Sequence, residues 1–580
     1  MTHGRARSMT MLSVVLATLL SSARAPSNAS PGGFAMVPVK KKLIAHGWEF
    51  NSLTPRDMPM FVEAMKDSPF DGVIMGFSAR GERDDDIAQI WTVANGRRWK
   101  KAWFAEDIKA LQQVRFGRFT DNFMRAAIAP VPQSWAPSVS RIAWTDDDRW
   151  EAVANNLGVL AWVAKQSGLK GLSLDPESYG GIRQYDYFPS DGEYDQAARL
   201  ARTRGAQVMH AIAREYPDIT LWAWLFSIKP QLVRTPTPGE IARQSGDLWT
   251  PFVNGMLDAL PPTVRLVDSD KSYTFQGHDF LEEANRVHNQ YLSLVAPESR
   301  DKYRRQVQVT FGVYVDAYAN PEGSTYYFPP LNGSRANRLR QVLSEALLAA
   351  DEYVWLYGER GCWQRWKTEH MDHADTPLWG AIIPDFARMI RLAAEPEVEG
   401  RREVEALRTK GKLADLATNP SFEGGLDEAG SSLPAAWMTW QQEGERSGVF
   451  SLATDLGFQS PSSAKAGGVQ DGCFIQGVPV TPGEVYAVEA LALPKGSSRC
   501  LLVVRWQTPD GRWTNEADDR QFCFIEPAGD WRKAFGVVSV PEGVGRMEIL
   551  LSVSQPSPSD SCWFDQVGVH RLVGAQPRQP

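Results

Sequence analysis

The sequence predicts an α/β barrel of the (β/α)8 class followed by an all-β sandwich, and three observations support this. With 580 residues, the chain is too long for one hydrophobic core. Between residues 38 and 397, short apolar runs alternate with segments of helical periodicity. From residue 415 to 573, the pattern changes to short alternating strands separated by Gly, Pro and Ser. We therefore expect a barrel domain and a sandwich domain, in that order.

Eight apolar runs are the expected strands of the barrel. They lie at 43–50, 72–77, 123–128, 170–175, 219–226, 264–267, 307–315 and 353–357, and the run at 123–128 is weak. Helical periodicity is clearest in the segments 59–66, 105–114, 149–166, 194–215, 278–294 and 335–351. Eight strands alternating with helices over this length are typical of a TIM barrel, with a doubly wound open sheet as the alternative. No glycine-rich phosphate motif follows the first strand, so a nucleotide cofactor is not expected.

The N-terminal segment predicts export. Residues 1–29 combine Arg5 and Arg7, an apolar run at 9–20 and then small residues, which is typical of a secretory signal peptide and its leader. No later apolar run is long enough to span a bilayer. We therefore expect a secreted or periplasmic protein without a membrane span.

The C-terminal part begins with a change in charge. Residues 398–414 are charged and helix-prone, and we interpret them as a connector. Strands of the sandwich are then predicted at 473–480, 484–492, 500–507, 533–540 and 546–553. The sandwich should resemble a jelly roll in having two antiparallel sheets around one core.

Cysteines are concentrated in the sandwich. Cys362 stands alone in the barrel region, whereas the other four are Cys473, Cys500, Cys523 and Cys562. In an exported protein four clustered cysteines can form two disulfides, and three pairings are open. Buried free thiols are the alternative interpretation.

Composition narrows the class of ligand. The formal net charge of -7 gives no electrostatic footprint for nucleic acid. The chain contains 21 tryptophans, about twice the usual share or more. Because sugar rings present flat C–H faces that stack on indole, this excess in an exported protein favours a poly- or oligosaccharide ligand, although many of these residues will be core.

The most informative segment for chemistry is 168–180, which ends a predicted strand in two carboxylates. In extended geometry Ser173, Asp175 and Glu177 share one face, and Pro176 suits the end of a strand. Like charges this close are expected to raise one pKa, as a general acid requires. The bland alternative is a loop carboxylate that caps the next helix.

Polar and aromatic residues also follow the other predicted strands, at the barrel end where functional loops converge. The proposed sugar-contacting residues are His46, Trp48, Glu49, Tyr179, Trp224, Tyr273, Tyr314, Asp316, Trp355 and Trp363. Simpler roles are open for some of them: His46 and Glu49 as a supporting pair, and Asp316 as a turn residue.

Two carboxyl groups flanking one bond are what glycosidic hydrolysis needs, one as an acid and one as a nucleophile or base. We assign Glu177 as general acid/base, with Glu359 or Asp268 as the second carboxylate; Asp268 is alternatively a helix cap. A carboxylate separation of about 5–5.5 Å would indicate retention, and about 6.5–9.5 Å inversion. The sequence thus predicts an exported glycoside hydrolase that needs no catalytic cofactor.

The Asp175-Pro-Glu177 pattern resembles the end of the catalytic motif of glycoside hydrolase family 18 and the hyaluronidases. That resemblance implies that Glu177 is the acid, that Asp175 orients a substrate N-acetyl group, and that Trp355 forms the floor of the subsite. The longer run of spaced aspartates typical of family 18 is missing from this sequence. As a whole, the barrel resembles glycoside hydrolases of environmental polysaccharide-degrading bacteria without matching one numbered family.

The sandwich carries a second resemblance. The segment 417–425, Ala-Thr-Asn-Pro-Ser-Phe-Glu-Gly-Gly, looks like the opening strand of CenC-like carbohydrate-binding modules of the galactose-binding-like class. The segment 562–569, Cys-Trp-Phe-Asp-Gln-Val-Gly-Val, is similar to their closing strand. The resemblance implies glycan binding and a structural calcium ion held by Glu423 and Asp565.

Two alternative functions stay open. A barrel that has kept its aromatic mouth and lost its chemistry would be a glycan-binding or surface protein. A metal-dependent hydrolase would use the cluster of His370, Asp372, His373 and Asp375, which otherwise reads as a solvated loop.

Overall fold

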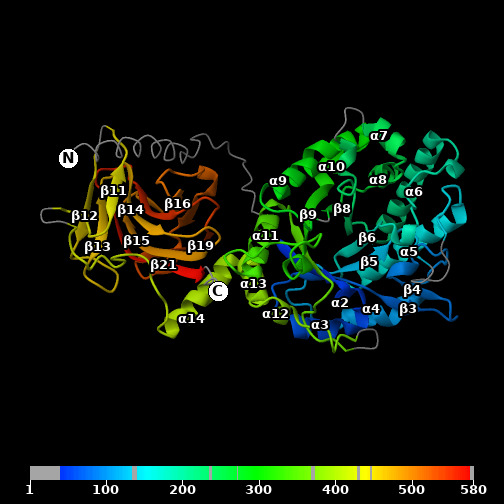
Figure 1. Cartoon of the computed structure of the whole chain (residues 1–580), viewed down its shortest axis with the longest axis horizontal. Helices are drawn as coiled ribbons and strands as arrows, with labels where there is room; N and C mark the ends of the chain where they lie inside the picture. The colour runs from blue at the N-terminus through cyan, green and yellow to red at the C-terminus, as the bar shows by residue number, and fades with distance from the viewer. Residues whose placement is uncertain are drawn as a thin grey trace. The chain divides into compact units, whose positions relative to one another are not determined.

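The computed structural model describes residues 40–132, 140–233, 238–270, 272–367, 372–427, 431–444 and 447–574. The predicted signal peptide and leader, 1–29, lie outside these ranges. The chain forms two compact units (Figure 1). The larger unit ends at Ala394, and the smaller one contains Leu331–Asn337 and the chain from Glu395 onward.

The larger unit is built on a closed barrel of eight parallel strands, which confirms the predicted parallel closed sheet (Figure 1). Around the barrel the order is β1-β10-β9-β8-β7-β6-β5-β2. The strands are β1 (Lys42–Gly47), β2 (Gly72–Met75), β5 (Phe123–Ala127), β6 (Gly171–Asp175), β7 (Thr220–Ala223), β8 (Arg265–Asp270), β9 (Val307–Tyr314) and β10 (Tyr353–Gly358). A small hairpin of β3 (Ser78–Arg80) and β4 (Ile87–Gln89) follows β2.

Every second residue of the strands points into the barrel, as a strand period of two requires. The resulting inner cluster is made of Ile44, Ile74, Phe123, Trp222, Val267, Tyr353 and Trp355, with Tyr273 and Tyr357 packed against it. Several of these side chains are large aromatics, so they fill the barrel. Toward the carboxyl ends of the strands the inward positions become polar, and there the candidate site begins.

Helices occupy the segments between the strands of the barrel and the segment after its last strand. They are α2 (Trp48–Asn51), α3 (Met58–Met65), α4 (Ala105–Gln112), α5 (Asp147–Gln166), α6 (Tyr194–Glu215), α7 (Pro238–Ser245), α8 (Trp249–Asp258), α9 (His278–Asn285), α10 (Arg300–Gln306), α11 (Arg335–Ala349), α12 (Trp379–Ile382) and α13 (Phe386–Ala394). Helix α5 contacts β5 and β6, and α6 packs between α5 and α8. The α6–α8 approach depends on glycine, because a Cβ at Gly205 would lie 1.9 Å from the Phe252 carbonyl oxygen.

The first strand is shorter than the predicted 43–50. It ends at Gly47, whose φ of 148° turns the chain into α2. A Cβ at this position would lie 2.5 Å from the carbonyl oxygen of Gly358, so the turn requires glycine. Trp48 and Glu49 therefore belong to a helical turn rather than to the strand.

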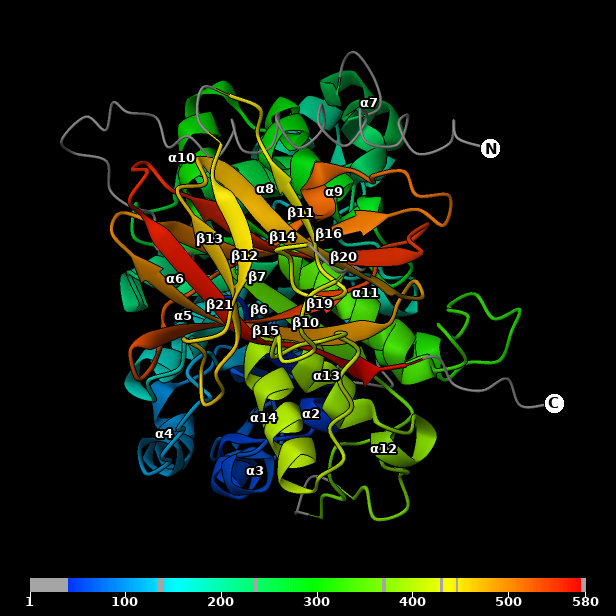
Figure 2. The same cartoon turned by 90° about the vertical axis from the view of Figure 1, so that its left-hand side faces the viewer.

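The smaller unit contains two antiparallel sheets (Figure 2). One sheet has the order β11-β14-β20-β16-β17, with β11 (Met438–Gln441), β14 (Asp471–Pro479), β20 (Arg546–Ser554), β16 (Arg499–Gln507) and β17 (Arg520–Cys523). The other has the order β12-β13-β21-β15-β19-β18, with β12 (Val449–Ala453), β13 (Ser463–Gly467), β21 (Ser561–Val573), β15 (Val485–Lys495), β19 (Trp531–Ser539) and β18 (Glu526–Ala528). An apolar core containing Phe474, Val504 and Phe564 fills the space between them.

The segment expected to open the sandwich is not a strand. Residues 417–425 form bends and turns, in which Asn419 and Phe422 have φ values of 51° and 61°. These positive φ values and Pro420, which has no N–H, are incompatible with a continuous ladder. The closing segment, by contrast, lies in β21.

Helix α14 (Pro396–Thr409) covers most of the segment interpreted as a connector. It packs against β19 and β21 of the smaller unit. Arg408 donates to Glu489 at 2.6 Å, and Arg401 forms an ion pair with Glu526. The helix is thus fastened to the sandwich by charge pairs as well as by packing.

The cysteines are free thiols in the structure. Cys500 on β16 and Cys562 on β21 contact one another across the sandwich core, whereas Cys473 lies on the opposite face of its sheet and Cys523 is exposed. We expect Cys500 and Cys562 to form one disulfide when the protein is produced in an oxidising compartment, stabilising the sandwich by about 2–4 kcal/mol. Peptide mapping without reduction should find this single link. A different pairing, or protection of both thiols in folded oxidised protein, would contradict it.

Candidate functional site

The carboxyl end of β6 presents two acidic side chains side by side, as the sequence predicted. Asp175 is buried and Glu177 is half-buried. The Asp175 Oδ1 atom accepts the backbone N–H of Glu177 at 3.0 Å, which fixes the turn between them. The Tyr179 hydroxyl lies 2.8 Å from Asp175 Oδ2 and 2.9 Å from Glu177 Oε2, so one phenol links both carboxylates.

Arg125 on β5 supplies a positive charge that sequence reasoning missed. Its Nη2 atom donates to Asp175 Oδ2 at 2.5 Å and to the Tyr179 hydroxyl at 3.1 Å, and Nη1 donates to Asn51 at 2.8 Å. Although burial disfavours the cation, the neighbouring Asp175 raises the pKa of Arg125. The guanidinium also lies over Trp91, 5.2 Å from its ring centroid. Asp175 is thus committed to an internal ion pair.

Glu359 follows β10 and is held by two phenols. The hydroxyl of Tyr357 donates to its Oε1 atom at 3.0 Å, and that of Tyr314 donates to Oε2 at 3.1 Å. The backbone N–H of Glu359 donates to Asp316 at 2.8 Å, and that of Arg360 does so at 3.1 Å. Asp316 is fully buried beneath this turn. Asp316 therefore acts as a turn residue, which was the second interpretation of the sequence, rather than as a sugar contact.

Tyr273 packs against the two tyrosines that bind Glu359. Burial raises its pKa, and so do the nearby charges of Glu177 and Glu359. Its ring is parallel to that of Tyr357, at an interplanar angle of 3° and a centroid distance of 5.9 Å, and it stacks on Tyr314 at 4.8 Å. The charges of both glutamates thus act on the Tyr273 phenol, although the two residues follow strands on opposite sides of the barrel. The residues around it form an aromatic mouth.

Glu49 does not pair with His46, contrary to one interpretation of the sequence. It is buried, and its oxygens accept the backbone N–H of Trp363 at 3.1 Å and the indole N–H of Trp366 at 2.7 Å. Burial raises the pKa of Glu49 to about 8. Glu49 therefore ties the segment after β10 to α2 and does not face a ligand.

This raised pKa predicts a pH-dependent stability. In the unfolded chain a glutamate titrates near about 4.3, so folding makes Glu49 bind a proton more tightly. Its contribution to the free energy of unfolding should be complete below that value and be lost as pH rises to about 8. Chemical denaturation at pH 5 and pH 8 checks this. Wild type should lose more stability than Glu49→Gln over that interval, and equal losses would contradict it.

Asp268 was one of the two candidates for the second catalytic carboxylate, and its surroundings correct this prediction. It is completely buried, and it accepts the backbone N–H groups of Leu225 and Phe226 at 2.9 and 3.3 Å and the Ser227 hydroxyl at 2.6 Å. Burial raises its pKa to about 6. With both oxygens occupied by the turn after β7, Asp268 is a structural carboxylate.

The predicted tryptophans have different environments. Trp48 is 58% exposed beyond β1, and Trp224 is half-buried beyond β7. Trp363 packs edge-on against Phe70, with ring centroids 4.7 Å apart, so it supports the fold. Trp355 is 2% exposed inside the barrel. Of these four tryptophans, Trp48 is therefore the most exposed and Trp355 is buried.

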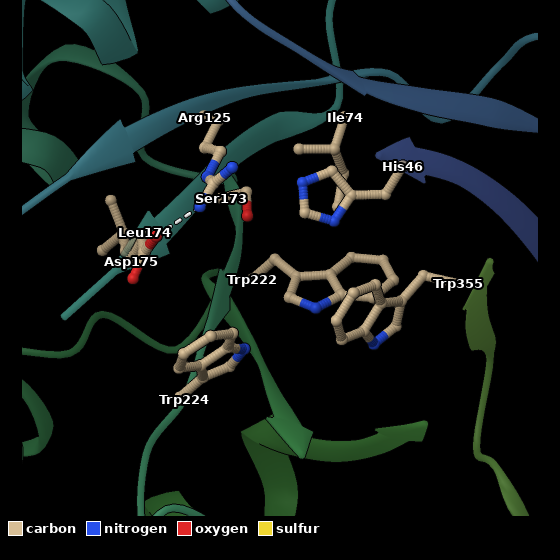
Figure 3. Close-up of a pocket in the computed structure, with 9 residues that line it drawn as sticks. All are labelled: His46, Ile74, Arg125, Ser173, Leu174, Asp175, Trp222, Trp224 and Trp355. Atoms are coloured by element: carbon tan, nitrogen blue, oxygen red, sulfur yellow. Dashed lines mark hydrogen bonds and ion pairs between the residues drawn. The ribbon is translucent and has the colours of Figure 1, made fainter. Parts of the chain in front are cut away.

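Two hollows border these groups. A small cavity of about 20 Å³ is lined by His46, Ile74, Arg125, Ser173, Leu174, Asp175, Trp222, Trp224 and Trp355 (Figure 3). A groove of about 600 Å³ is bordered by Glu359, Arg360, Lys367, Asp372, Asp375 and Pro377. Glu359 thus borders a groove large enough for several sugar-sized groups.

The residues of the metal-dependent alternative lie only partly within the described ranges. His370 lies outside the described residues, and His373 contacts the Thr376 hydroxyl at 3.3 Å. Within the described ranges, no group of three or more His, Cys, Asp or Glu side chains is placed to hold a metal ion. No helix in those ranges is long and apolar enough to cross a membrane.

The two residues implied in calcium binding lie in the sandwich. Both Glu423 oxygens accept from Ser462, at 2.8 and 3.0 Å. Asp565 accepts the backbone N–H groups of Phe458 and Gln566 at 2.6 and 2.7 Å. Burial, and to a lesser degree the charge of Glu423, raises the pKa of Asp565 to about 6. The charge of Glu423 thus acts on the Asp565 carboxyl group.

Comparison with known proteins gives limited similarity. No family model matches the chain, and no curated protein matches it in sequence. Solved structures similar to part of it include the enzymatically active domain of tailspike protein 4 of bacteriophage CBA120, with 18% identity over 27% of this chain and 21% of that one (TM-score 0.23). The CBM22-1 xylan-binding domain of Xyn10C from Paenibacillus barcinonensis has 16% identity over 28% of this chain and 97% of its own length (TM-score 0.21).

A third similar structure is the arabinose-bound α-L-arabinofuranosidase MgGH51, with 15% identity over 28% of this chain and 27% of that one (TM-score 0.21). The chain therefore spans about a fifth of the length of the tailspike domain and about a quarter of that of the arabinofuranosidase. Matches of this extent assign no function to the chain.

Proposed function

We propose that the protein is an exported glycoside hydrolase of the TIM-barrel class, in which Glu177 and Glu359 cleave an O-glycosidic bond. The observation that carries the proposal is that Glu177 and Glu359 follow β6 and β10, whose carboxyl ends lie at the same end of the closed parallel barrel, with Tyr273 packed against the tyrosines that bind Glu359. The two carboxylates come from β6 and β10, on different sides of the barrel. Two carboxyl groups that flank one bond are what this reaction requires.

Glu177 is suited to the acid/base role. It is half-buried, and the Tyr179 hydroxyl fixes its carboxyl group at 2.9 Å. In the proposed reaction Glu177 gives its proton to the leaving glycosidic oxygen as the bond to the anomeric carbon breaks. The ion pair between Arg125 and Asp175 positions Tyr179, and so acts through it.

Glu359 is suited to the opposite role of nucleophile or base. Hydrogen bonds from the Tyr314 and Tyr357 hydroxyls hold its carboxyl group in place. As a carboxylate it attacks the anomeric carbon, or removes a proton from an attacking water, on the face opposite to Glu177. The groove of about 600 Å³ that it borders would accommodate neighbouring sugar units.

The aromatic surroundings support a carbohydrate substrate. Trp48 is 58% exposed at the strand ends, and Tyr326 is also exposed beside Tyr273 and Tyr314. Exposed rings at a concave polar site suit the flat C–H faces of sugars better than they suit bulk water. The substrate we infer is a poly- or oligosaccharide.

We also propose that the sandwich binds glycan. Along β16, Val504 and Trp506 face the core, whereas Val503 and Arg505 face the other side of the sheet. On that side Arg505 lies 4.3 Å from the ring centroid of Trp513, and its Nε atom donates to Asp519 at 3.0 Å. Its Nη1 atom is buried and has no hydrogen-bond partner among the described residues. A module of modest affinity would raise the local substrate concentration by tethering.

The proposal is tested by assaying the purified full chain against a panel of polysaccharides and aryl glycosides, reading reducing ends and free aglycone. Product from wild type that is lost in a Glu177→Gln variant supports hydrolysis at this site. Saturable glycan binding without product from any substrate would favour the alternative of a glycan-binding protein with an inactive barrel.

Calcium binding by the sandwich is a separate expectation. Glu423 and Asp565 offer hard, negatively charged oxygen donors, as calcium prefers. At a calcium concentration about 100 times the Kd, the sandwich should gain about 2.7 kcal/mol in unfolding free energy. Thermal unfolding of the full chain with EGTA and with calcium checks this. The calcium-dependent shift should disappear in Glu423→Gln, and identical curves for wild type under both conditions would contradict the site.

A further inference from the structure

The small cavity inside the barrel mouth has room for one oxygen atom. Its volume of about 20 Å³, as open to a water-sized sphere, compares with roughly 10–15 Å³ needed for one water. Figure 3 shows Arg125, Ser173 and Asp175 on one side of this space and His46, Trp222 and Trp355 on the other. The cavity therefore combines polar walls with indole surfaces.

Polar atoms at this cavity lack partners. Both ring nitrogens of His46 are buried without a hydrogen bond among the described residues, and so is the indole nitrogen of Trp355, a side chain that is 2% exposed. In Figure 3 one imidazole nitrogen points toward Arg125 and Ser173, and the other points toward the two indoles. Buried polar groups left without partners are costly, so a visiting group that satisfies them would gain affinity.

The state of His46 limits what that group can be. Burial lowers its pKa far below the usual value, and the charge of Arg125 does so further. A neutral imidazole offers one N–H donor and one lone pair, and the indole of Trp355 offers one donor. A hydroxyl group can both accept and donate, whereas a carboxylate can only accept.

Size limits the group further. A carboxylate has three heavy atoms and an acetamido group has four, so the space open to a water-sized sphere suits a hydroxyl group better than either of them. Asp175 and Ser173 line the cavity, and Glu177 lies two residues beyond Asp175. A group in the cavity would therefore belong to the sugar ring next to the bond being cleaved.

We propose that the cavity seats one hydroxyl group of that sugar, so that the substrate carries a neutral hydroxyl at this position and neither a uronic carboxylate nor an N-acetyl group. This inference rests on the proposed function. The family 18 resemblance instead implies a substrate whose N-acetyl group is oriented by Asp175. The structure argues against that role, because Asp175 Oδ2 already accepts hydrogen bonds from Arg125 and Tyr179. A water molecule bound in the cavity would make the same hydrogen bonds as a substrate hydroxyl, so the test must distinguish these two occupants.

The test compares wild type with His46→Phe, which keeps a ring and removes both nitrogens. His210→Phe, at an exposed position on α6, is the matched control, and Ser173→Ala is a milder second change in the cavity wall. Each protein is assayed for kcat/KM against the best neutral aryl glycoside, its monodeoxy analogues, and its N-acetylamino and uronic acid counterparts. Circular dichroism establishes that each variant is folded.

With the wild-type protein, we expect kcat/KM for one monodeoxy analogue to be about tenfold lower than kcat/KM for the parent glycoside. His46→Phe should lower activity on the parent about tenfold while leaving that analogue unchanged, and Ser173→Ala should do the same to a smaller degree. Equal losses on the parent and all analogues would identify a resident water and overturn the proposal. Efficient cleavage of the N-acetylamino or uronic acid counterpart modified at the identified carbon would also overturn it.

Failure of the proposed function can be separated from failure of this inference. If no glycoside is cleaved, calorimetric titration with the same free sugars and their deoxy analogues replaces the assay. Binding that His46→Phe weakens for the parent but not for one deoxy analogue would support the seat in a non-catalytic barrel. Binding that is identical in wild type and His46→Phe for every sugar would overturn it.

Discussion

Glu177→Gln should lower kcat by about 10²–10⁴-fold, because it removes the proton that the leaving oxygen needs. Substrate binding should change little, since glutamine keeps the size of the side chain and can still accept the hydrogen bond from Tyr179. The loss should be smaller for aryl glycosides with acidic leaving groups, which depart without protonation. Initial rates on two aryl glycosides of different leaving-group acidity check this.

The control for this variant is Glu193→Gln, which removes an exposed glutamate just before α6. It should behave as wild type in both rate and thermal unfolding. Full activity in Glu177→Gln would remove Glu177 from the mechanism. A loss that is the same for good and poor leaving groups would show that Glu177 does not act as the general acid.

Glu359→Gln should be as damaging, because glutamine neither attacks the anomeric carbon nor activates water. In the variant an amide NH2 group also replaces one carboxylate oxygen. That group cannot accept the hydrogen bond that Tyr314 or Tyr357 donates to this oxygen. We expect kcat to fall by about 10²–10⁴-fold on every substrate, whatever its leaving group. Rates on the same two aryl glycosides measure this.

Added azide then reports the stereochemical course. If the mechanism is retaining, azide should restore turnover in Glu359→Gln and give a glycosyl azide of inverted configuration. Glu322→Gln, an exposed position after β9, is the matched control and should keep full activity. If Glu359→Gln is as active as wild type, Glu359 is not the second catalytic carboxylate.

The parallel barrel could be predicted because its signals are local. Each strand is a short apolar run, and the alternation of runs and helices fixes the parallel order. Strand ends were less accurate where one residue decides the turn, as at Gly47, whose role depends on the distant Gly358. The opening of the sandwich was missed for a similar reason, since the backbone of Asn419 and Phe422 adopts positive φ.

The candidate site could be predicted only in part. Alternation placed Asp175 and Glu177 together, because both lie on one short segment. Arg125 was missed because its partner is 50 residues away, although a charge inside a buried run was a usable signal. Glu49 and Asp268 look like site acids in sequence, and only their buried backbone donors show that they hold turns.

The central claim is that Glu177 and Glu359 act on one bond, and a double-mutant cycle tests it most directly. Rates would be measured for wild type, Glu177→Gln, Glu359→Gln and the double variant on the best substrate of the panel. Residues that act as a unit are strongly non-additive. We predict that the double variant loses little more activity than either single one. A double loss equal to the product of the two single losses, or single variants as active as wild type, would contradict the account.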